Sequence, residues 1–345
     1  MDKINKVIFR ADGASFLGYG HIYQSLTLAG IFCERGYEVS FAVKDYEPAV
    51  IDYVKNKGIS VIAIPSAAGE DEDFDILLEY AQRLGAKVVV IDHHLLGCGY
   101  ALKIREKGIV VVNIDDEGKR KFCGDILINY NIYAPQIKYS AENHTKFLLG
   151  PRYAVLRKEF EPPVAMKNKV DKHLLVVLGG GYARGEVVKV LEALKLLDNS
   201  LLKEISPQII LGPGYPNPQD IILKHSHYPV TVHFDPKNIR DLMEKSGFAI
   251  CAGGGTLYEF ARMGVLPIII ILDENQILNA ESFSKAGIAE NLGWYEDVSP
   301  GKIAEAIKRQ FNSLISPRER ADNIMPLVDG LGARRVVDAI CRVKQ

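Results

Sequence analysis

The chain has 345 residues, of which 48% are hydrophobic and 25% are charged, and its formal net charge at pH 7 is −1. These values are typical of a folded globular protein and exclude the disordered and fibrous classes. The charges nearly cancel, so there is no basic excess to bind a phosphate backbone, and we expect no nucleic acid as a partner. At roughly 150 residues per domain, the length predicts two domains.

The cysteines are scattered along the chain without a CxxC pair: Cys33, Cys98, Cys123, Cys251 and Cys341. This spacing suggests neither a zinc cluster nor a disulfide framework, so we expect reduced thiols. The first residues lack the apolar core of a signal peptide. The longest apolar run, 265–272, is far shorter than the ~20 residues that span a bilayer. We therefore predict a cytoplasmic protein without stable membrane insertion.

The predicted strands are short apolar runs that alternate with helical patterns, and they form two series. The first series comprises 7–11, 38–43, 59–64, 87–92, 109–114 and 126–129. The second series comprises 173–178, 208–211, 230–234, 248–251 and 266–272. Unbroken apolar strands separated by helix-length segments predict βαβ units and parallel sheets that are covered on both faces.

The segment 158–172 carries prolines and lysines and interrupts both periodicities, so we place the domain linker there. The predicted fold class is α/β, with two Rossmann-like, doubly wound domains. The N-terminal domain would span 1–163, the C-terminal domain 164–330, and a final helix 331–345. Ligands of such sheets bind outside the carboxyl ends of the strands, so the loops that follow the strands are the candidate sites.

The loop after the first strand, DGASFLGYGH, places His21 in the first turn of a predicted helix. Glycines such as Gly18 and Gly20 permit a tight backbone near a ligand. The partial positive charge of a helix N-terminus disfavours imidazolium, so we expect a neutral His21, the form that a general base requires. The alternative is a histidine that only hydrogen-bonds the turn.

The run IDHHLLG places Asp92, His93 and His94 at the end of a strand. A metal site would need further ligands, and Asp115 with Asp116, after the next strand, is the only obvious candidate pair. The pattern favours substrate hydrogen bonding or orientation of His21 instead. We expect no bound metal and no cofactor.

The run CAGGGTLYEFARMG ends a strand in glycines and begins a helix at about Thr256. Backbone N–H groups at such a helix start, near Gly254 and Gly255, suit phosphate oxygens. The run has no Walker A lysine and no GxGxxG spacing, so it supports neither a P-loop NTPase nor a dinucleotide-binding fingerprint. Glu259 could accept hydrogen bonds from ribose hydroxyls, or it could be a surface acid favoured by the helix dipole.

Two further loops carry candidate ligand contacts. GGGYARG, with Gly180, precedes a helix and could reach the same diphosphate. DENQ ends an apolar strand, and Asn275 and Gln276 supply amides suited to sugar or base edges, although both could equally be helix caps. Near the first loop, we also expect Arg10 and Asp12 to contact the substrate.

In this order, the runs resemble the UDP-sugar hydrolases of the pseudaminic acid pathway and the related spore-coat polysaccharide biosynthesis proteins. The matching segments are RADGASFLGYGHIYQSLTLA, VVIDHHLLG, IDDEGKRKFCGDILINYN, LLGPRYAVLRKEF, LGGG, AGGGTLYEFARMGVLPIIIILDENQ and DGLGARR. The resemblance implies a GT-B fold, shared with MurG-like glycosyltransferases, in which two Rossmann-like domains clasp a nucleotide sugar. It places the chain in nonulosonic acid or surface polysaccharide biosynthesis. Separately, we expect a monomer or weak oligomer.

The resemblance also implies a reaction. Water attacks the anomeric carbon of a UDP-linked 2,4-diacetamido-2,4,6-trideoxy hexose with inversion and without a metal, and UDP leaves. His21 matches the family's loop histidine, which acts as the base. The remaining implied contacts are Gly254, Gly255 and Thr256 on the diphosphate, Glu259 on the ribose, and Asn275 and Gln276 near the sugar and phosphates.

Two positions depart from the family pattern. His94 stands where the hydrolases commonly carry tyrosine, and Gln24 stands where an arginine often follows the loop histidine. Both lie on the sugar side, so they bear on the identity of the sugar. Two other functions fit the same pattern: a glycosyltransferase, in which a hydroxyl acceptor replaces water, and a nucleotide-sugar-binding module without turnover.

Overall fold

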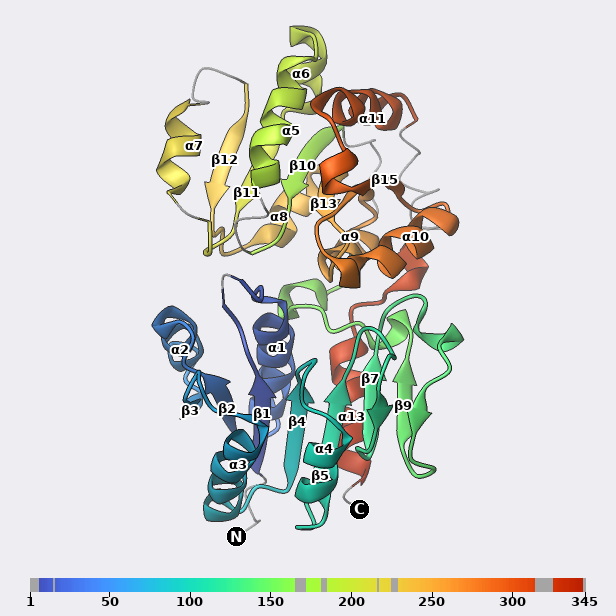
Figure 1. The fold of residues 1–345 in the computed structure, drawn as a ribbon. Helices are drawn as coiled ribbons and strands as arrows, with labels where there is room; N and C mark the ends of the chain where they lie inside the picture. The colour runs from blue at the N-terminus through green and yellow to red at the C-terminus, as the bar shows by residue number, and fades with distance from the viewer. Residues whose placement is uncertain are drawn as a thin grey trace. The chain divides into compact units, whose positions relative to one another are not determined.

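The computed structural model describes residues 6–14, 16–164, 172–180, 185–215, 217–224, 229–313 and 325–343. It divides into two compact units (Figure 1). Unit 1 comprises residues 1–157 and 331–345, and unit 2 comprises residues 158–330. The division therefore falls at 157/158 rather than at the expected 163/164. The C-terminal helix, α13 (Gly332–Val343), belongs to unit 1 and packs against α1 (Gly20–Glu34).

Unit 1 is built on a parallel sheet with the strand order β3-β2-β1-β4-β5-β7-β9. Its strands are β1 (Lys6–Ala11), β2 (Glu38–Lys44), β3 (Ser60–Ile64), β4 (Val88–Asp92), β5 (Val110–Ile114), β7 (Ile126–Asn129) and β9 (Lys146–Leu149). Its other helices are α2 (Pro48–Lys55), α3 (Glu70–Leu84) and α4 (Cys98–Arg105), and β6 (Lys121–Phe122) pairs with β8 (Ser140–Ala141). β4 is buried along its whole length, as expected for a strand covered on both faces.

Unit 2 repeats this plan with the strand order β12-β11-β10-β13-β14-β15, again in parallel. Its strands are β10 (His173–Val177), β11 (Gln208–Leu211), β12 (Thr231–Phe234), β13 (Ser246–Ala252), β14 (Leu266–Ile271) and β15 (Glu290–Trp294). Its helices are α5 (Glu186–Lys195), α6 (Asn199–Ile205), α7 (Pro218–Lys224), α8 (Ile239–Glu244), α9 (Thr256–Met263), α10 (Ile277–Lys285) and α11 (Pro300–Asn312).

Two features of unit 2 bear on the sequence predictions. Phe160, inside the expected linker, is buried, and its carbonyl accepts a hydrogen bond from Arg262 Nε at 3.1 Å. The start of that segment therefore packs as part of unit 2, while 165–171 lie outside the described residues. The edge strand β15 was not predicted, because the glycine and polar residues of ENLGW break the apolar pattern.

In each sheet the strand order reverses at one point, between β1 and β4 in unit 1 and between β10 and β13 in unit 2. The loops at the carboxyl ends of these two strand pairs diverge, and this divergence is where open α/β sheets bind ligands. In unit 1 these loops lie between β1 and His21 in α1, and directly after Asp92 at the end of β4; in unit 2 they carry Gly180 and Gly254. The fold thus gives each sheet one candidate edge for ligand binding.

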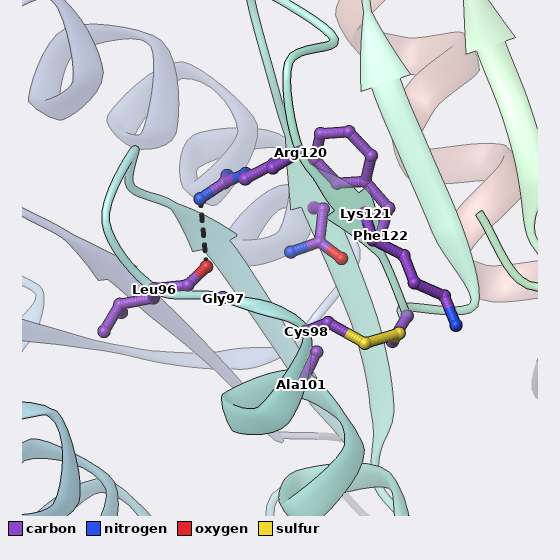
Figure 2. Close-up of a pocket in the computed structure, with 9 residues that line it drawn as sticks. Leu96, Gly97, Cys98, Ala101, Arg120, Lys121 and Phe122 are labelled. Carbon is purple, nitrogen blue, oxygen red and sulfur yellow. Dashed lines mark hydrogen bonds between the residues drawn. A yellow bond between two sulfur atoms is a disulfide. The ribbon is translucent and has the colours of Figure 1, made fainter. Parts of the chain in front are cut away.

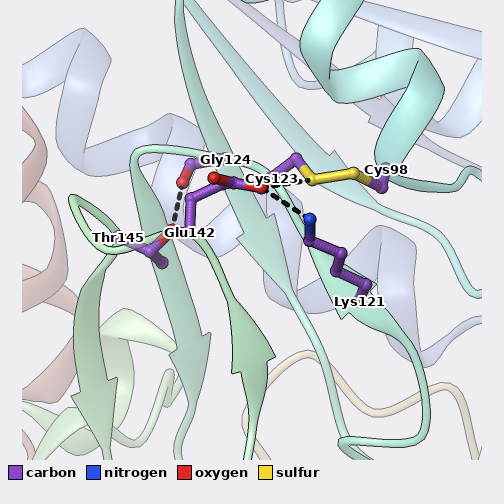
Figure 3. Close-up of a disulfide and its surroundings, with 6 residues drawn as sticks. All are labelled: Cys98, Lys121, Cys123, Gly124, Glu142 and Thr145. Atoms are coloured by element: carbon purple, nitrogen blue, oxygen red, sulfur yellow. Dashed lines mark hydrogen bonds and ion pairs between the residues drawn. A yellow bond between two sulfur atoms is a disulfide. The ribbon is translucent and has the colours of Figure 1, made fainter.

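The prediction that the thiols are all reduced is wrong for one pair. Cys98 and Cys123 form a disulfide, with their Cα atoms 5.0 Å apart (Figure 3). Cys98 begins α4 and Cys123 follows β6, so the fold brings together two segments that the sequence separates by 25 residues. Cys33, Cys251 and Cys341 are free. No helix within the described ranges is long and apolar enough to cross a membrane.

Candidate active site

His21 lies in the first turn of α1 and is paired with Asp92, the last residue of β4. The Nδ1 atom of His21 is 2.7 Å from Asp92 Oδ1. The carboxylate is almost fully buried, with 1% of its side chain exposed, whereas 19% of the His21 side chain is exposed. Because Asp92 accepts a hydrogen bond from the Nδ1–H group, the Nε2 atom is the nitrogen left for chemistry.

The second carboxylate oxygen of Asp92 is also held. Gln24 Nε2 donates to Asp92 Oδ2 at 2.6 Å, and Ser25 Oγ donates to the same atom at 3.0 Å. Tyr130 OH in turn donates to Gln24 Oε1 at 3.0 Å. Donors on both oxygens fix the plane of the carboxylate, which fixes the tautomer and the orientation of the imidazole. Gln24, a departure from the family pattern, therefore supports the pair.

The charge state of His21 differs from the sequence expectation. Burial lowers its pKa, but the nearby carboxylates of Asp92, Asp116 and Asp12 outweigh burial and raise the pKa to about 9. One pKa unit corresponds to about 1.4 kcal/mol, whereas a helix N-terminus contributes ~0.3–1 kcal/mol. The carboxylates therefore have a larger effect on the His21 pKa than the helix dipole. The free protein holds His21 as imidazolium at pH 7, and the prediction of a neutral side chain is wrong.

His94 lies beside His21 in the loop after β4, with its side chain exposed. The two ring centroids are 4.6 Å apart and the rings are nearly perpendicular. Although His94 is an exposed residue, partial burial of its ring and the charge on His21 lower its pKa, so a neutral imidazole lies next to a charged one. Asp116, in the loop after β5, completes the group. One ligand-type atom from each of these three side chains lies within 4.8 Å of the others.

The side chains that the sequence offered as metal ligands do not come together as one site in the structure. His93 Nε2 lies 3.0 Å from Asp12 Oδ2, and its Nδ1 accepts the Leu95 N–H at 3.1 Å, so both ring nitrogens are engaged. Asp115 Oδ2 accepts the N–H groups of Glu117 and Gly118 and closes a turn. Within the described part of the chain, the group of potential ligands is instead His21, His94 and Asp116.

Arg10 and Asp12 form a charged layer within unit 1. Arg10 has no exposed surface, and its guanidinium donates to Asp12 at 2.6 and 2.9 Å and to Asp73 at 2.6 Å. Tyr100 OH donates to Asp73 Oδ1 at 2.8 Å. A buried guanidinium with two carboxylate partners cannot reach a ligand without leaving them. The structure thus places Arg10 in a supporting position, not in the substrate contact that the sequence suggested.

Asp73 belongs to the charged layer around Arg10, and sequence reasoning missed it. It lies in the acidic run EDEDFD at the start of α3, which resembles a solvated helix N-terminus. Only 1% of its surface is exposed, while the neighbouring acids of this run are largely exposed. The available signal was Arg10 itself, because an arginine inside an apolar strand requires a buried anion.

The glycine loop before α1 is tightly folded. Gly18 adopts φ +82°, and its N–H donates to Ala14 O at 2.8 Å. A Cβ on Gly13 would lie 2.7 Å from Ile22 Cγ1, so any larger residue would force Ile22 to move. The loop tip presents Phe16 and Leu17, with 70% and 48% of their surfaces exposed. Contacts of Gly18 and Gly20 with substrate remain predictions.

In unit 2, the glycine run after β13 leads directly into α9. Gly255 is the N-cap residue and Thr256 the first helical residue, and no side chain caps the helix start. Backbone N–H groups at such a start attract anions. A Cβ added at Gly254 would meet no atom within 4 Å, whereas one at Gly253 would lie 2.9 Å from Gln276. The open space at Gly254 is therefore available to a ligand.

The other predicted contacts in unit 2 are placed as follows. Gln276 Oε1 accepts the N–H groups of Gly253 and Leu272, so this side chain joins two loops. Asn275 is exposed. Glu259 is 8% exposed, which excludes the surface-acid alternative. Gly180 O accepts the Gly214 N–H at 2.9 Å, and the remainder of that loop, 181–184, lies outside the described residues.

A small hollow in unit 1 lies between the disulfide and the His94 loop (Figure 2). Its lining includes Leu96, Cys98, Arg120 and Cys123 but neither His21 nor Asp92. Arg120 Nη1 donates to the carbonyls of His94 at 2.6 Å and Leu96 at 2.9 Å. Arg120 therefore holds the backbone of the loop that carries His94.

Comparison with known proteins identifies the fold. Residues 174–331 match the glycosyltransferase family 28 C-terminal domain. The chain also superimposes on the crystal structure of MurG from Acinetobacter baumannii with a TM-score of 0.68 at 18% identity, covering 98% of this chain and 99% of that one. The chain therefore has the GT-B fold, as the resemblance implied.

Three curated proteins are similar to this chain in sequence. The spore coat polysaccharide biosynthesis protein SpsG of Bacillus subtilis is 25% identical over 94% of this chain and 95% of its own length. The UDP-2,4-diacetamido-2,4,6-trideoxy-beta-L-altropyranose hydrolase of Campylobacter jejuni is 26% identical over 82% of this chain and 97% of its own length. An uncharacterized protein of Methanocaldococcus jannaschii is 26% identical over 79% of this chain. The chain spans 56% of the length of that archaeal relative.

Proposed function

We propose that this protein hydrolyses a UDP-linked sugar and releases UDP by attack of water at the anomeric carbon. The observation that carries the proposal is the pair formed by His21 and Asp92, a preoriented acid–base group at the switch point of a sheet. The names of two relatives support a 2,4-diacetamido-2,4,6-trideoxy hexose as the sugar and surface polysaccharide biosynthesis as the setting.

In this proposal, unit 1 supplies the base. Neutral His21 Nε2 takes a proton from water, the water oxygen forms a bond to the anomeric carbon, and the bond from that carbon to the phosphate oxygen breaks. UDP leaves with the electron pair of that bond, and a single displacement inverts the anomeric centre. Asp92 stabilises the imidazolium that forms. The carboxylates that raise the His21 pKa make its neutral form a stronger base. They also lower the fraction of His21 that is neutral at pH 7.

Unit 2 binds the nucleotide in this proposal. The backbone N–H groups at Gly255 and Thr256, at the start of α9, would hold the diphosphate. The same groups stabilise the charge that develops on the leaving UDP, without a metal and without protonation. Glu259 accepts hydrogen bonds from the ribose, and Asn275 with the side-chain NH2 of Gln276 contacts the phosphates and the sugar.

The test is nucleotide release in the absence of an acceptor. The protein is incubated with a panel of UDP-, CDP- and GDP-sugars that includes UDP-linked diacetamido sugars, and the free nucleotide is quantified. We expect UDP release with a diacetamido sugar, and NMR of the fresh product should show the inverted anomer. The absence of release from every donor would contradict the proposal.

A glycosyltransferase is the second candidate, and a specific observation favours it. Residues 174–331 match a glycosyltransferase domain, and the loop before α1 exposes Phe16 and Leu17, which could face an apolar acceptor. His21 would then deprotonate an acceptor hydroxyl. The two functions separate in one assay, because a transferase releases UDP slowly from its donor until an acceptor is added.

A further inference from the structure

Three potential metal ligands come from three neighbouring segments of unit 1. His21 follows β1, His94 follows β4 and Asp116 follows β5, and these three strands are adjacent in the sheet. Their carboxyl ends therefore deliver two imidazoles and one carboxylate to the same edge. One nitrogen or oxygen atom from each side chain lies within 4.8 Å of the others.

Each member of this group is anchored from outside it. His21 Nδ1 is bonded to Asp92, which leaves Nε2 directed away from that carboxylate. Asp116 Oδ1 accepts from Asn131 Nδ2 at 3.1 Å. The backbone of His94 is held by Arg120 through the His94 carbonyl. A histidine that gives its second nitrogen to a buried carboxylate is the usual arrangement around a protein-bound metal ion.

We propose that His21, His94 and Asp116 bind one divalent transition-metal ion, for which Zn²⁺ is the probe. Two imidazoles and one carboxylate form a ligand set that suits Zn²⁺, and three protein ligands leave a position open for water. Mg²⁺, which prefers oxygen ligands and retains its waters, fits this set poorly. This metal was not expected from the sequence, and it goes beyond the proposed hydrolysis.

The group must contract a little to bind the ion. Tetrahedral Zn²⁺ with bonds of about 2.0–2.1 Å places its ligand atoms about 3.4 Å apart, against the 4.8 Å limit in this structure. His94 can supply the movement because its side chain is exposed, whereas His21 is fixed by Asp92. Binding releases the proton that Nε2 of the His21 imidazolium carries at pH 7. The negative field from Asp92, Asp12 and Glu117 around the two histidines favours the entry of the cation in its place.

Metal binding has one consequence that rests on the proposed function. An ion on His21 Nε2 occupies the atom that would take the proton from water, so Zn²⁺ should inhibit hydrolysis. The binding itself does not depend on the substrate. It is therefore measured on the full chain without any sugar nucleotide, and its outcome is separate from that of the hydrolysis assay.

The experiment titrates tag-free protein, stripped with EDTA and desalted, with Zn²⁺ in a calorimeter. We expect one equivalent to bind, and Co²⁺ to show a visible ligand-field band that Zn²⁺ removes. His94→Ala and Asp116→Asn should each weaken Zn²⁺ binding by at least about tenfold. Asp92→Asn, which loosens His21, should weaken it by about tenfold or more.

Two matched variants control for other zinc ligands. His144 is an exposed histidine in the loop before β9, and Cys33 is an exposed free thiol on α1. His144→Ala and Cys33→Ser should each retain the wild-type affinity within about twofold, and circular dichroism verifies the fold of every variant. The proposal is overturned by an absence of saturable binding to the wild type, by unchanged affinity in His94→Ala, or by an equal loss in either control.

Discussion

The two units have similar parallel sheets, but different residues lie at the carboxyl ends of their strands. In unit 1 the edge carries titratable side chains joined in a network, including His21, Asp92 and His94. In unit 2 the corresponding edge carries Gly254, Gly255 and an uncapped helix start. Side chains can gain and lose protons, whereas backbone N–H groups can only donate hydrogen bonds to an anion.

The difference suggests a division of labour. Substitution of a charged side chain in unit 1 should change the rate of the chemical step or the stability of the unit. Addition of a Cβ to the glycine loop of unit 2 should change nucleotide affinity. A unit 1 variant that changes only nucleotide affinity, or a unit 2 variant that changes only the rate of the chemical step, would contradict this division.

The largest expected effect is that of His21→Ala. Loss of the base should lower the rate of UDP release by roughly 10²–10⁴-fold, while the affinity for UDP stays within about twofold. The measurements are the initial rate of UDP release and calorimetric binding of UDP. His144→Ala is the control histidine. A variant that retains the wild-type rate would remove His21 from the mechanism.

The second prediction concerns the charged layer that supports the site. Asp73→Ala leaves the wholly buried Arg10 with one carboxylate instead of two and should lower the free energy of unfolding by about 3 kcal/mol. Urea unfolding measures it. The control is Asp71→Asn. Asp71 is a nearby exposed acid in the same helix that pairs with Lys103, so its replacement should not measurably change the free energy of unfolding. Equal stability of the two variants would contradict a structural role for Asp73.

The third prediction is the pH dependence of hydrolysis. The base must be neutral, and the pKa of His21 is raised to about 9, so the rate should rise about tenfold per pH unit from pH 7 and level off above pH 9. Asp92→Asn removes the main charge that raises this pKa and should move the inflection to lower pH. Both profiles are recorded with EDTA present. A wild-type profile that is flat from pH 7 to 9 would contradict this state of the base.

These regions also differ in how far the sequence predicts them. Apolar runs predicted the main strands of both sheets, because buried parallel strands are continuous and apolar. The runs at β9 and β15 were missed, because KFLL is short and half-exposed and ENLGW contains a glycine. The strand-end rule singled out His21 and Asp92 as candidates, and the structure places them 2.7 Å apart.

The interactions between distant segments were beyond prediction. The charge on His21 depends on carboxylates at the carboxyl ends of β1, β4 and β5, whereas the sequence shows only that His21 begins a helix. The disulfide between Cys98 and Cys123 depends on the return of the chain through β6. The choice of Asp73 among the acids of EDEDFD depends on the rotation of α3 against Arg10. Each of these requires the tertiary structure.

The smallest expected effect belongs to the glycine edge of unit 2. Gly254→Ala adds a methyl group that meets no protein atom within 4 Å, so the fold should tolerate it. If the diphosphate lies against this backbone, the methyl group displaces it and UDP affinity should fall by about tenfold, a loss of about 1.4 kcal/mol. Gly30→Ala, a helical glycine of unit 1 that is equally open, is the matched control.

The two alanine variants distinguish ligand contact from a general effect of glycine replacement. Calorimetric titration with UDP should show weaker binding for Gly254→Ala and unchanged binding for Gly30→Ala, with similar melting temperatures for both. His21→Ala should retain UDP binding in the same assay. Unchanged affinity in Gly254→Ala would place the diphosphate elsewhere, and the glycine run would then be explained by Gly253 alone, where a Cβ would collide with Gln276.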